Sequence, residues 1–141
     1  MVKTQDDLSK VTVIGTTTWG TTLGLILARR GFTVRLWARS EKEAGKLNAD
    51  RSNELRLPGH IFPSTLTATS SLREALHDSG AVILAVPSQA LRENAGQLRD
   101  AIAGSPLIIS AVKGLEAASY KRMSEILIEE LPDGFDQRIC V

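Results

Sequence analysis

Short runs of β-branched and other apolar residues alternate along the chain with longer segments whose apolar residues recur at helical spacing. The short runs predict buried strands, at residues 11–14, 33–37, 66–69, 81–86, 106–111 and 138–141. The longer segments predict helices, at residues 19–30, 40–50, 71–77, 88–102 and 117–131. Ser40 with Glu43 predicts a capping box, and Ser88 predicts an N-cap. Residues 51–63, with two prolines and a glycine, are predicted as a loop.

Strands and helices therefore alternate from one end of the chain to the other. This order requires parallel strands joined by right-handed crossovers, so we expect an α/β fold with a doubly wound, mainly parallel sheet and helices on both faces. Residues 1–10 read as a short polar N-terminal segment. The last apolar strand ends with the chain, and because a buried strand needs neighbours we expect the parent protein to continue.

Composition excludes several classes of protein. The 141 residues carry a net charge of +1 with both signs mixed, and only 4% are aromatic, so neither a nucleic-acid nor a membrane surface is expected. The N-terminal segment has no apolar core typical of a secretory signal, which favours a cytoplasmic protein. The single cysteine, Cys140, is expected to be buried in a strand, and His60 and His77 to lie on the surface. With no Cys/His cluster, no metal site is predicted.

The first strand-to-helix turn has glycine spacing typical of dinucleotide binding. Gly15 permits a tight turn, and Gly20 and Gly24 let the following helix approach the sheet. The helix N-terminus then offers N–H groups to a pyrophosphate. Thr17 stands where the middle glycine of the fingerprint belongs, and its branched side chain is expected to crowd the phosphate, unless the hydroxyls of residues 16–18 bind it instead. The alternative is a plain turn of an α/β protein.

Three further positions follow the carboxyl ends of predicted strands, where doubly wound sheets bind ligands. Arg39 and Ser40 follow the second strand without a carboxylate before Glu41, which favours NADP over NAD or the use of both. Pro87 stiffens the turn after the strand at 81–86. Lys113, before Gly114, could bind a phosphate or polarise a carbonyl. The alternatives are a solvated arginine, a strand terminator and a loop lysine in water.

Several segments in fixed order together carry a family resemblance. They are Val13-Ile14-Gly15, Trp19-Gly20-Thr21, Leu36-Trp37-Ala38-Arg39, Leu47-Asn48-Ala49-Asp50-Arg51, Leu57-Pro58-Gly59, Ala85-Val86-Pro87-Ser88-Gln89 and Lys113-Gly114-Leu115-Glu116. From about Val11 to the last residue the chain resembles the N-terminal domain of bacterial NAD(P)-dependent glycerol-3-phosphate dehydrogenase. The resemblance implies an NAD(P)-binding Rossmann domain at residues 11–141.

The resemblance also implies roles for individual residues. Thr18, in place of the usual serine, Trp19 and Arg39 would contact the cofactor, and Lys113 would contact both cofactor and substrate. Two departures concern the cofactor: Thr17 replaces a glycine, and Arg56 stands where the family often has a tyrosine. The family's proton-accepting lysine belongs to a C-terminal helical domain beyond the last residue of this chain. We therefore expect no catalytic residue here.

The implied reaction is hydride transfer between sn-glycerol 3-phosphate and dihydroxyacetone phosphate, carried out by a full-length enzyme, with this domain inactive alone. The cofactor would be NADP or NAD, and the substrates the partners of the full enzyme. The oligomeric state stays open, a homodimer included. The alternative is a stand-alone nucleotide-binding or protein-interaction module without catalysis.

Overall fold

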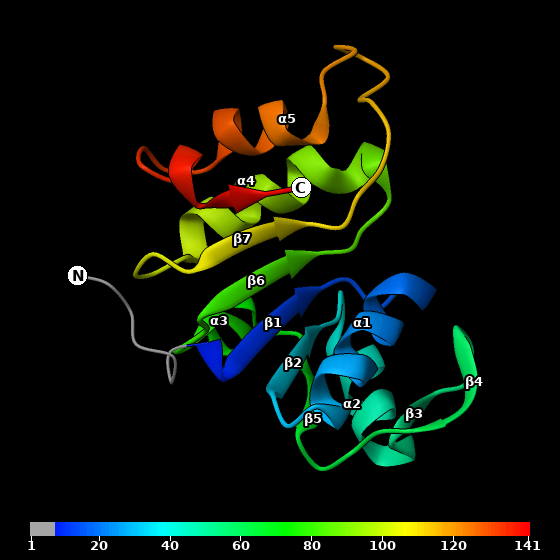
Figure 1. Ribbon diagram of the computed structural model, residues 1–141. Coiled ribbons are helices and arrows are strands. Elements are labelled where there is room, and N and C mark those ends of the chain that lie inside the picture. The colour runs from blue at the N-terminus through cyan, green and yellow to red at the C-terminus, as the bar shows by residue number, and fades with distance from the viewer. Residues whose placement is uncertain (1–7) are drawn as a thin grey trace.

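The computed structural model describes residues 8–141, and they form a six-stranded parallel sheet with helices on both faces (Figure 1). The strand order is β5-β2-β1-β6-β7-β8. The strands are β1 (Lys10–Ile14), β2 (Thr33–Trp37), β5 (Leu66–Thr69), β6 (Ala81–Leu84), β7 (Leu107–Ser110) and β8 (Ile139–Cys140). Every neighbouring pair is parallel, with Val13 beside both Leu36 and Ile83. The predicted doubly wound α/β fold is confirmed, although the polar segment predicted at 1–10 lies mostly outside the described residues.

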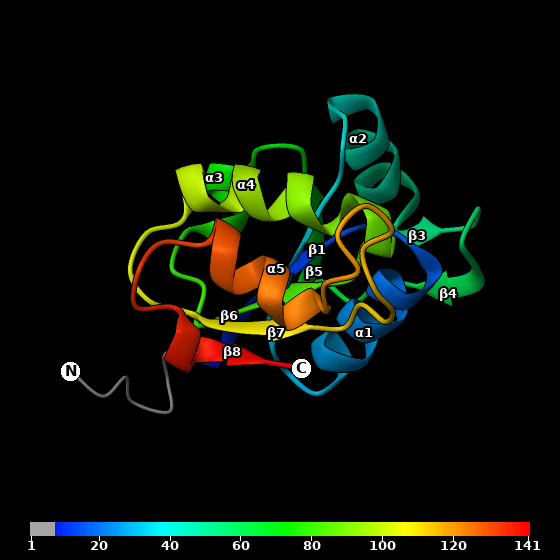
Figure 2. The ribbon, with the colours of Figure 1, turned by 90° about the horizontal axis from the view of Figure 1, so that it is seen from above.

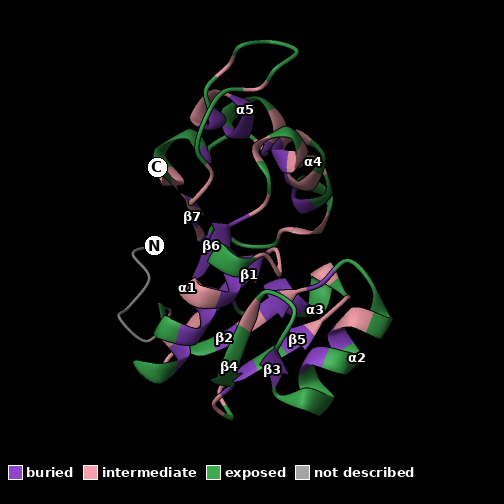
Figure 3. Ribbon diagram, turned by 90° about the vertical axis from the view of Figure 1, so that its right-hand side faces the viewer, coloured by how far each residue is buried: buried purple, intermediate pink, exposed green. Residues whose placement is uncertain are grey.

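The alternation of side chains along the strands divides the apolar core into two layers. Val11 and Val13 of β1 point into the layer that contains α1 (Thr18–Arg29) and α2 (Glu41–Asp50). Ile14 points into the layer that contains α3 (Leu72–Leu76), α4 (Leu91–Ala101) and α5 (Met123–Glu130). Figure 2 shows α4 and α5 on the same side of β7 and β8. Buried residues line the central strands, while the outer sides of the helices are exposed (Figure 3).

The segment at 51–63 is not the predicted loop. It forms a small antiparallel ribbon from β3 (Ser52–Asn53) and β4 (Leu57–Ile61), outside the main sheet. Pro58 is tolerated because β4 has a free edge that needs no N–H donor there. The buried Asn53 amide donates to the carbonyl of Thr16 at 3.1 Å and to Oγ1 of Thr21 at 2.9 Å. The ribbon therefore supports the glycine-rich turn after β1.

Three local predictions at the second half of the chain are corrected. The helix predicted at 117–131 begins only at Met123, because Tyr120 adopts φ 58°, which ends helical geometry. Ser88 is no N-cap: it opens a 3-10 turn, η2 (Ser88–Ala90), and no side chain caps α4. Cys140 is exposed rather than buried, because β8 is an edge strand that follows a second 3-10 turn, η3 (Asp136–Arg138).

No helix in the described part of the chain is long and apolar enough to cross a membrane. Within residues 8–141, no three His, Cys, Asp or Glu side chains come together in a way that could hold a metal ion.

Candidate dinucleotide site

The turn between β1 and α1 depends on its glycines. Gly15 has φ 115°, and a Cβ there would lie 2.6 Å from the Ala85 carbonyl oxygen. A Cβ on Gly20 would lie 2.3 Å from the carbonyl oxygen of Gly15, and one on Gly24 would lie 2.9 Å from Cδ2 of Leu36. Real Cβ atoms do not approach so closely, so these three glycines allow α1 to start directly over the end of the sheet. The predicted reasons for Gly15, Gly20 and Gly24 are therefore confirmed.

Thr17 occupies its position without backbone strain. Its φ of −63° and ψ of 168° are extended, so this residue needs none of the positive φ that would favour glycine. Thr17 is the N-cap of α1, because its Oγ1 accepts from the N–H of Gly20 at 3.0 Å. Of the N–H groups in the first helical turn, those of Thr18 and Trp19 have no intrahelical acceptor. They are available to an anion at the helix N-terminus.

The hydroxyl groups of residues 16–18 all donate to protein acceptors. Thr16 Oγ1 donates to the carboxylate of Glu43, Thr17 Oγ1 to the carbonyl of Ala85 and Thr18 Oγ1 to that of Arg56. A hydroxyl group has one hydrogen to donate, so each would have to leave its present acceptor before it could donate to a phosphate. The idea that these hydroxyls stand ready to replace the missing glycine is therefore not favoured by the geometry.

A cleft of about 220 Å³ opens beside this turn. Its lining comes from the carboxyl ends of β1, β2 and β6 and from the helices and ribbon next to them: Gly15, Thr16, Thr17, Trp37, Arg39, Glu43, Arg56, Val86, Pro87, Ala90 and Asn94. Arg39 and Arg56 are both exposed, and within residues 8–141 neither has a carboxylate at ion-pair distance. Two unpaired guanidinium groups on one cleft suit a ligand that carries phosphates.

A second groove of about 350 Å³ adjoins the cleft between α2 and the β3–β4 ribbon. Arg39, Glu43 and Arg56 line both hollows, and Ser40 lines only this one. Ser40 Oγ accepts from the N–H of Glu43 at 3.1 Å and so caps α2 as predicted. The other half of the predicted capping box is absent among the bonds of the described chain, because the Glu43 carboxylate accepts from Thr16 instead.

Comparison with known proteins shows the family to which this chain belongs. Residues 10–141 match the family model described as the N-terminus of NAD-dependent glycerol-3-phosphate dehydrogenase. The chain belongs to this family. It is 46% identical over 135 residues to glycerol-3-phosphate dehydrogenase [NAD(P)+] of Dehalococcoides mccartyi, which covers 95% of this chain and 38% of that protein. It is 46% identical over 122 residues to the Chlorobium limicola enzyme of the same name, covering 86% of this chain and 37% of that one.

Solved structures agree with these relatives. Glycerol-3-phosphate dehydrogenase from Coxiella burnetii superposes with a TM-score of 0.80 at 32% identity, over 86% of this chain and 37% of that one. The Saccharomyces cerevisiae enzyme superposes with a TM-score of 0.75 at 28% identity, over 86% of this chain and 39% of that one. The chain thus spans about two-fifths of the length of the relatives it matches. The family resemblance and the Rossmann-type fold expected from the sequence are confirmed.

The glycerol-3-phosphate dehydrogenase domain brings together only some of the predicted site residues. Gly15, Thr17, Arg39 and Pro87 line the 220 Å³ cleft. The others lie near it: Gly20 is buried beneath the turn, Ser40 lines the adjoining groove, Thr18 and Trp19 are exposed on the first turn of α1, and Lys113 is exposed three residues beyond β7. The roles of all these residues toward a cofactor stay predictions.

Sequence reasoning missed two groups on the cleft. Glu43 was considered only as a capping residue, and its contact with Thr16 joins positions 27 residues apart, which no local pattern reveals. Asn94 lies one turn into α4 and reads as an ordinary helix-surface residue. In the sequence, Arg56 stands out only as a departure from a tyrosine; the structure places it on the cleft as a second cation beside Arg39.

Proposed function

We propose that this domain binds NADP(H), and also NAD(H), across the carboxyl edge of its parallel sheet. The pyrophosphate would lie at the N-terminus of α1, and the adenosine half would lie in the cleft that Arg39 and Arg56 line. The observation that carries the proposal is this cleft, which the glycine turn and two unpaired guanidinium groups line, next to the first turn of α1. A dinucleotide, with its two linked phosphates, fits that set of groups.

The residues of this chain would bind and orient the cofactor, and the bound nicotinamide would supply or accept the hydride. Arg39 would hold the adenosine 2′-phosphate, with Ser40 as a second donor, and so favour NADP(H). Thr18 and Trp19 would contact the phosphates through the first turn of α1. Pro87 would stiffen the turn that follows β6, next to the bound cofactor. Lys113 would reach the nicotinamide end and the substrate.

For a full-length enzyme, the proposed reaction is the reversible oxidation of sn-glycerol 3-phosphate to dihydroxyacetone phosphate. The matched segment covers only 38% of the Dehalococcoides mccartyi glycerol-3-phosphate dehydrogenase, so that relative is about 2.6 times as long as the segment. These 141 residues alone would bind cofactor without turnover, because Lys113 is the one residue here proposed to meet the substrate. A cytoplasmic location and a homodimeric assembly are part of the same proposal, to be measured on full-length protein by fractionation and sedimentation.

Calorimetric titration of the isolated chain with NADPH and NADH tests the proposal. Saturable binding of either cofactor would support it, and the double variant Arg39→Ala/Arg56→Ala should weaken NADPH strongly. The alternative is a module without dinucleotide binding, favoured by the observation that the hydroxyls of residues 16–18 all donate inward. If neither cofactor binds to the folded chain, that alternative replaces the proposal.

A further inference from the structure

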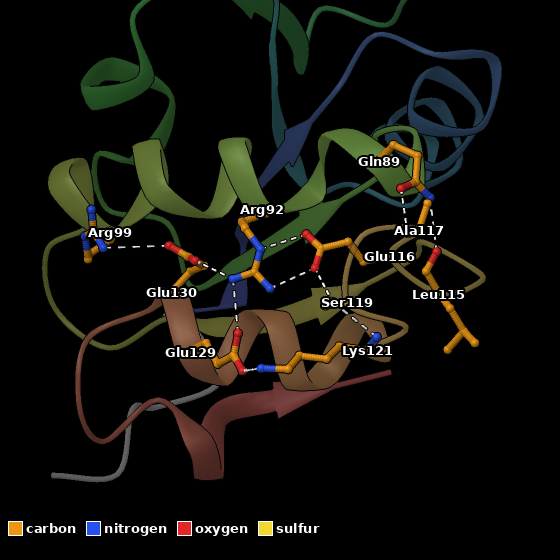
Figure 4. Close-up of polar contacts among 10 residues, drawn as sticks. All are labelled: Gln89, Arg92, Arg99, Leu115, Glu116, Ala117, Ser119, Lys121, Glu129 and Glu130. Carbon is orange, nitrogen blue, oxygen red and sulfur yellow. Dashed lines mark hydrogen bonds and ion pairs between the residues drawn. The ribbon is translucent and has the colours of Figure 1, made fainter.

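Two side chains at the start of α4 hold the loop that follows Lys113 (Figure 4). Gln89 Nε2 donates to the carbonyl of Leu115 at 3.0 Å, and the N–H of Ala117 donates to Gln89 Oε1 at 2.9 Å. Arg92 binds the Glu116 carboxylate with two parallel bonds, from Nε at 2.7 Å and from Nη2 at 2.9 Å. Three consecutive loop residues are thus held by two residues three positions apart, which lie on one side of a helical turn. We name this pair the Gln89–Arg92 clamp.

Arg92 is itself fixed by the helix behind it. Its Nη1 donates to Glu130 at 2.6 Å and to Glu129 at 3.1 Å, both at the end of α5. Bidentate binding fixes the plane of a carboxylate as well as its distance, and Glu116 is only 13% exposed, so this pair is shielded better than most surface ion pairs. The bonds from Arg92 and then Ser119 lower the pKa of Glu116 from its ordinary 4.5 to about 2.

The clamp fixes the backbone on the C-terminal side of Lys113. On its N-terminal side, the chain is held by the sheet up to Ser110, the last residue of β7. On its C-terminal side, the clamp takes hold at Leu115. Gly114, at φ 101°, turns the backbone between these supports, and Lys113 itself is exposed with no hydrogen-bond or ion-pair partner in the part of the chain that is described. The backbone on either side therefore sets the point at which the Lys113 side chain leaves the loop.

We infer that Gln89 and Arg92 are positioning residues that hold Lys113 at the cofactor edge of the sheet. This rests on the proposed function, because it assigns Lys113 to the nicotinamide end of the bound cofactor. It also explains why the segments at residues 85–89 and 113–116 occur together, because the clamp joins them. Residues of this kind act through another residue and touch neither cofactor nor substrate.

The test combines hydrogen exchange with a double-mutant cycle on the folded chain. The clamp variants are Gln89→Ala and Arg92→Met, each made also in a Lys113→Ala background. Arg99→Met is the matched control, because Arg99 lies on the same helix and pairs with Asp100 and Glu130 but does not touch the loop. Peptide amide exchange over residues 112–117 reports the order of the loop, and NADPH titration reports the position of Lys113.

Each clamp variant is expected to speed exchange of the loop by roughly 30-fold, the factor for the two hydrogen bonds to the loop that each removes at about 1 kcal/mol apiece, while Arg99→Met leaves it unchanged. Each clamp variant should weaken NADPH about as much as Lys113→Ala does, with no further loss when the two are combined. A clamp that merely stabilises the fold would instead leave the NADPH affinity of the folded variants unchanged, and a loss of affinity by another route would add to that of Lys113→Ala. Gln89 is exposed, so Gln89→Ala keeps the test informative if Arg92→Met does not fold.

Two results would overturn the inference: loop exchange that is unchanged in both clamp variants, or NADPH losses that add to that of Lys113→Ala. An unchanged affinity of Lys113→Ala would overturn it as well, while leaving cofactor binding intact. If even the unsubstituted chain binds no NADPH, the proposed function itself fails, and the exchange rates then decide separately whether the clamp orders the loop.

Discussion

Replacing Thr17 with glycine tests two effects of its side chain, one on the stability of the fold and one on dinucleotide binding. Its Oγ1 caps α1 and also bonds to the Ala85 carbonyl, at 3.0 and 2.8 Å. A Thr-to-Gly change at an N-cap costs a few tenths of a kcal/mol, and a lost hydrogen bond to a carbonyl costs about 1 kcal/mol. We therefore expect Thr17→Gly to lower the free energy of unfolding by roughly 1–2 kcal/mol, which corresponds to a Tm lower by roughly 3–8 °C.

The same change is expected to strengthen dinucleotide binding. Without the branched side chain, the backbone at position 17 can come close to the pyrophosphate, and one recovered phosphate hydrogen bond is worth about 1 kcal/mol, or roughly fivefold in Kd. Glycine needs no change of backbone there, because the extended φ of Thr17 suits any residue. Calorimetric titration with NADPH at a temperature well below both melting points measures the effect without interference from unfolding.

Two companion variants make the result interpretable. Thr17→Ser keeps both hydrogen bonds and removes only the methyl group, so it should retain the stability and gain part of the affinity. Thr22→Ala is the control: Thr22 lies one turn along α1, donates to the carbonyl of Thr18, and lies outside the cleft lining. If Thr17→Gly binds NADPH no better, or worse, then Thr17 belongs to a working phosphate site and its side chain does not crowd the ligand.

Four further outcomes are expected. Arg39→Ala should weaken NADPH by about 5- to 150-fold and NADH less, and equal losses measured by titration would place Arg39 away from the 2′-phosphate. The isolated chain should oxidise no glycerol 3-phosphate with NAD or NADP in a spectrophotometric assay, and turnover at ordinary dehydrogenase rates would falsify this. Gly24→Ala should lower the free energy of unfolding in urea by about 1–3 kcal/mol, because its Cβ would lie 2.9 Å from Cδ2 of Leu36. Gly45→Ala should not lower it, because a Cβ at Gly45 meets nothing within 4 Å. The lowered pKa of Glu116 means that its carboxylate stabilises the fold above about pH 4.5 and progressively less as the pH falls toward 2, so the Tm advantage over Glu116→Gln should shrink across that range.

The parts of this fold that the sequence predicts well are those decided by neighbouring residues. The run at 81–86 is apolar on both faces, as a central parallel strand requires, and β6 lies between β1 and β7. The glycine spacing at Gly15 and Gly20 predicts a strand-to-helix turn, and a Cβ on Gly20 would meet the carbonyl oxygen of Gly15, five residues earlier in the chain. In these two places, burial and the tight turn leave a direct trace in local composition, and the prediction is confirmed.

The parts that were predicted wrongly depend on contacts between distant segments. The residues at 117–122 have fair helical spacing, yet they form a turn: the N–H of Glu116 donates to the carbonyl of Lys121, and the Glu116 side chain is bound by Arg92, 24 positions earlier. Likewise, the carboxylate of Glu43 is drawn away from its own helix to Thr16. In both places, a partner far along the chain offers a better bond than the local one, and no periodicity in the sequence records it.

The contrast between the arginines of this domain decides where an anion can bind. Arg92 lies among three carboxylates, Glu116, Glu129 and Glu130, so its charge is neutralised within the protein and serves to hold a loop. Arg39 and Arg56 lie on the cleft without such partners in the described chain, so their charge is left for a ligand. Composition makes these three arginines equivalent. The difference arises only when the crossovers of the parallel sheet place α4 against the carboxylates of α5 and leave the end of β2 facing the open turn. This arrangement, rather than the number of basic residues, is the reason we propose that phosphates bind at the carboxyl edge of the sheet.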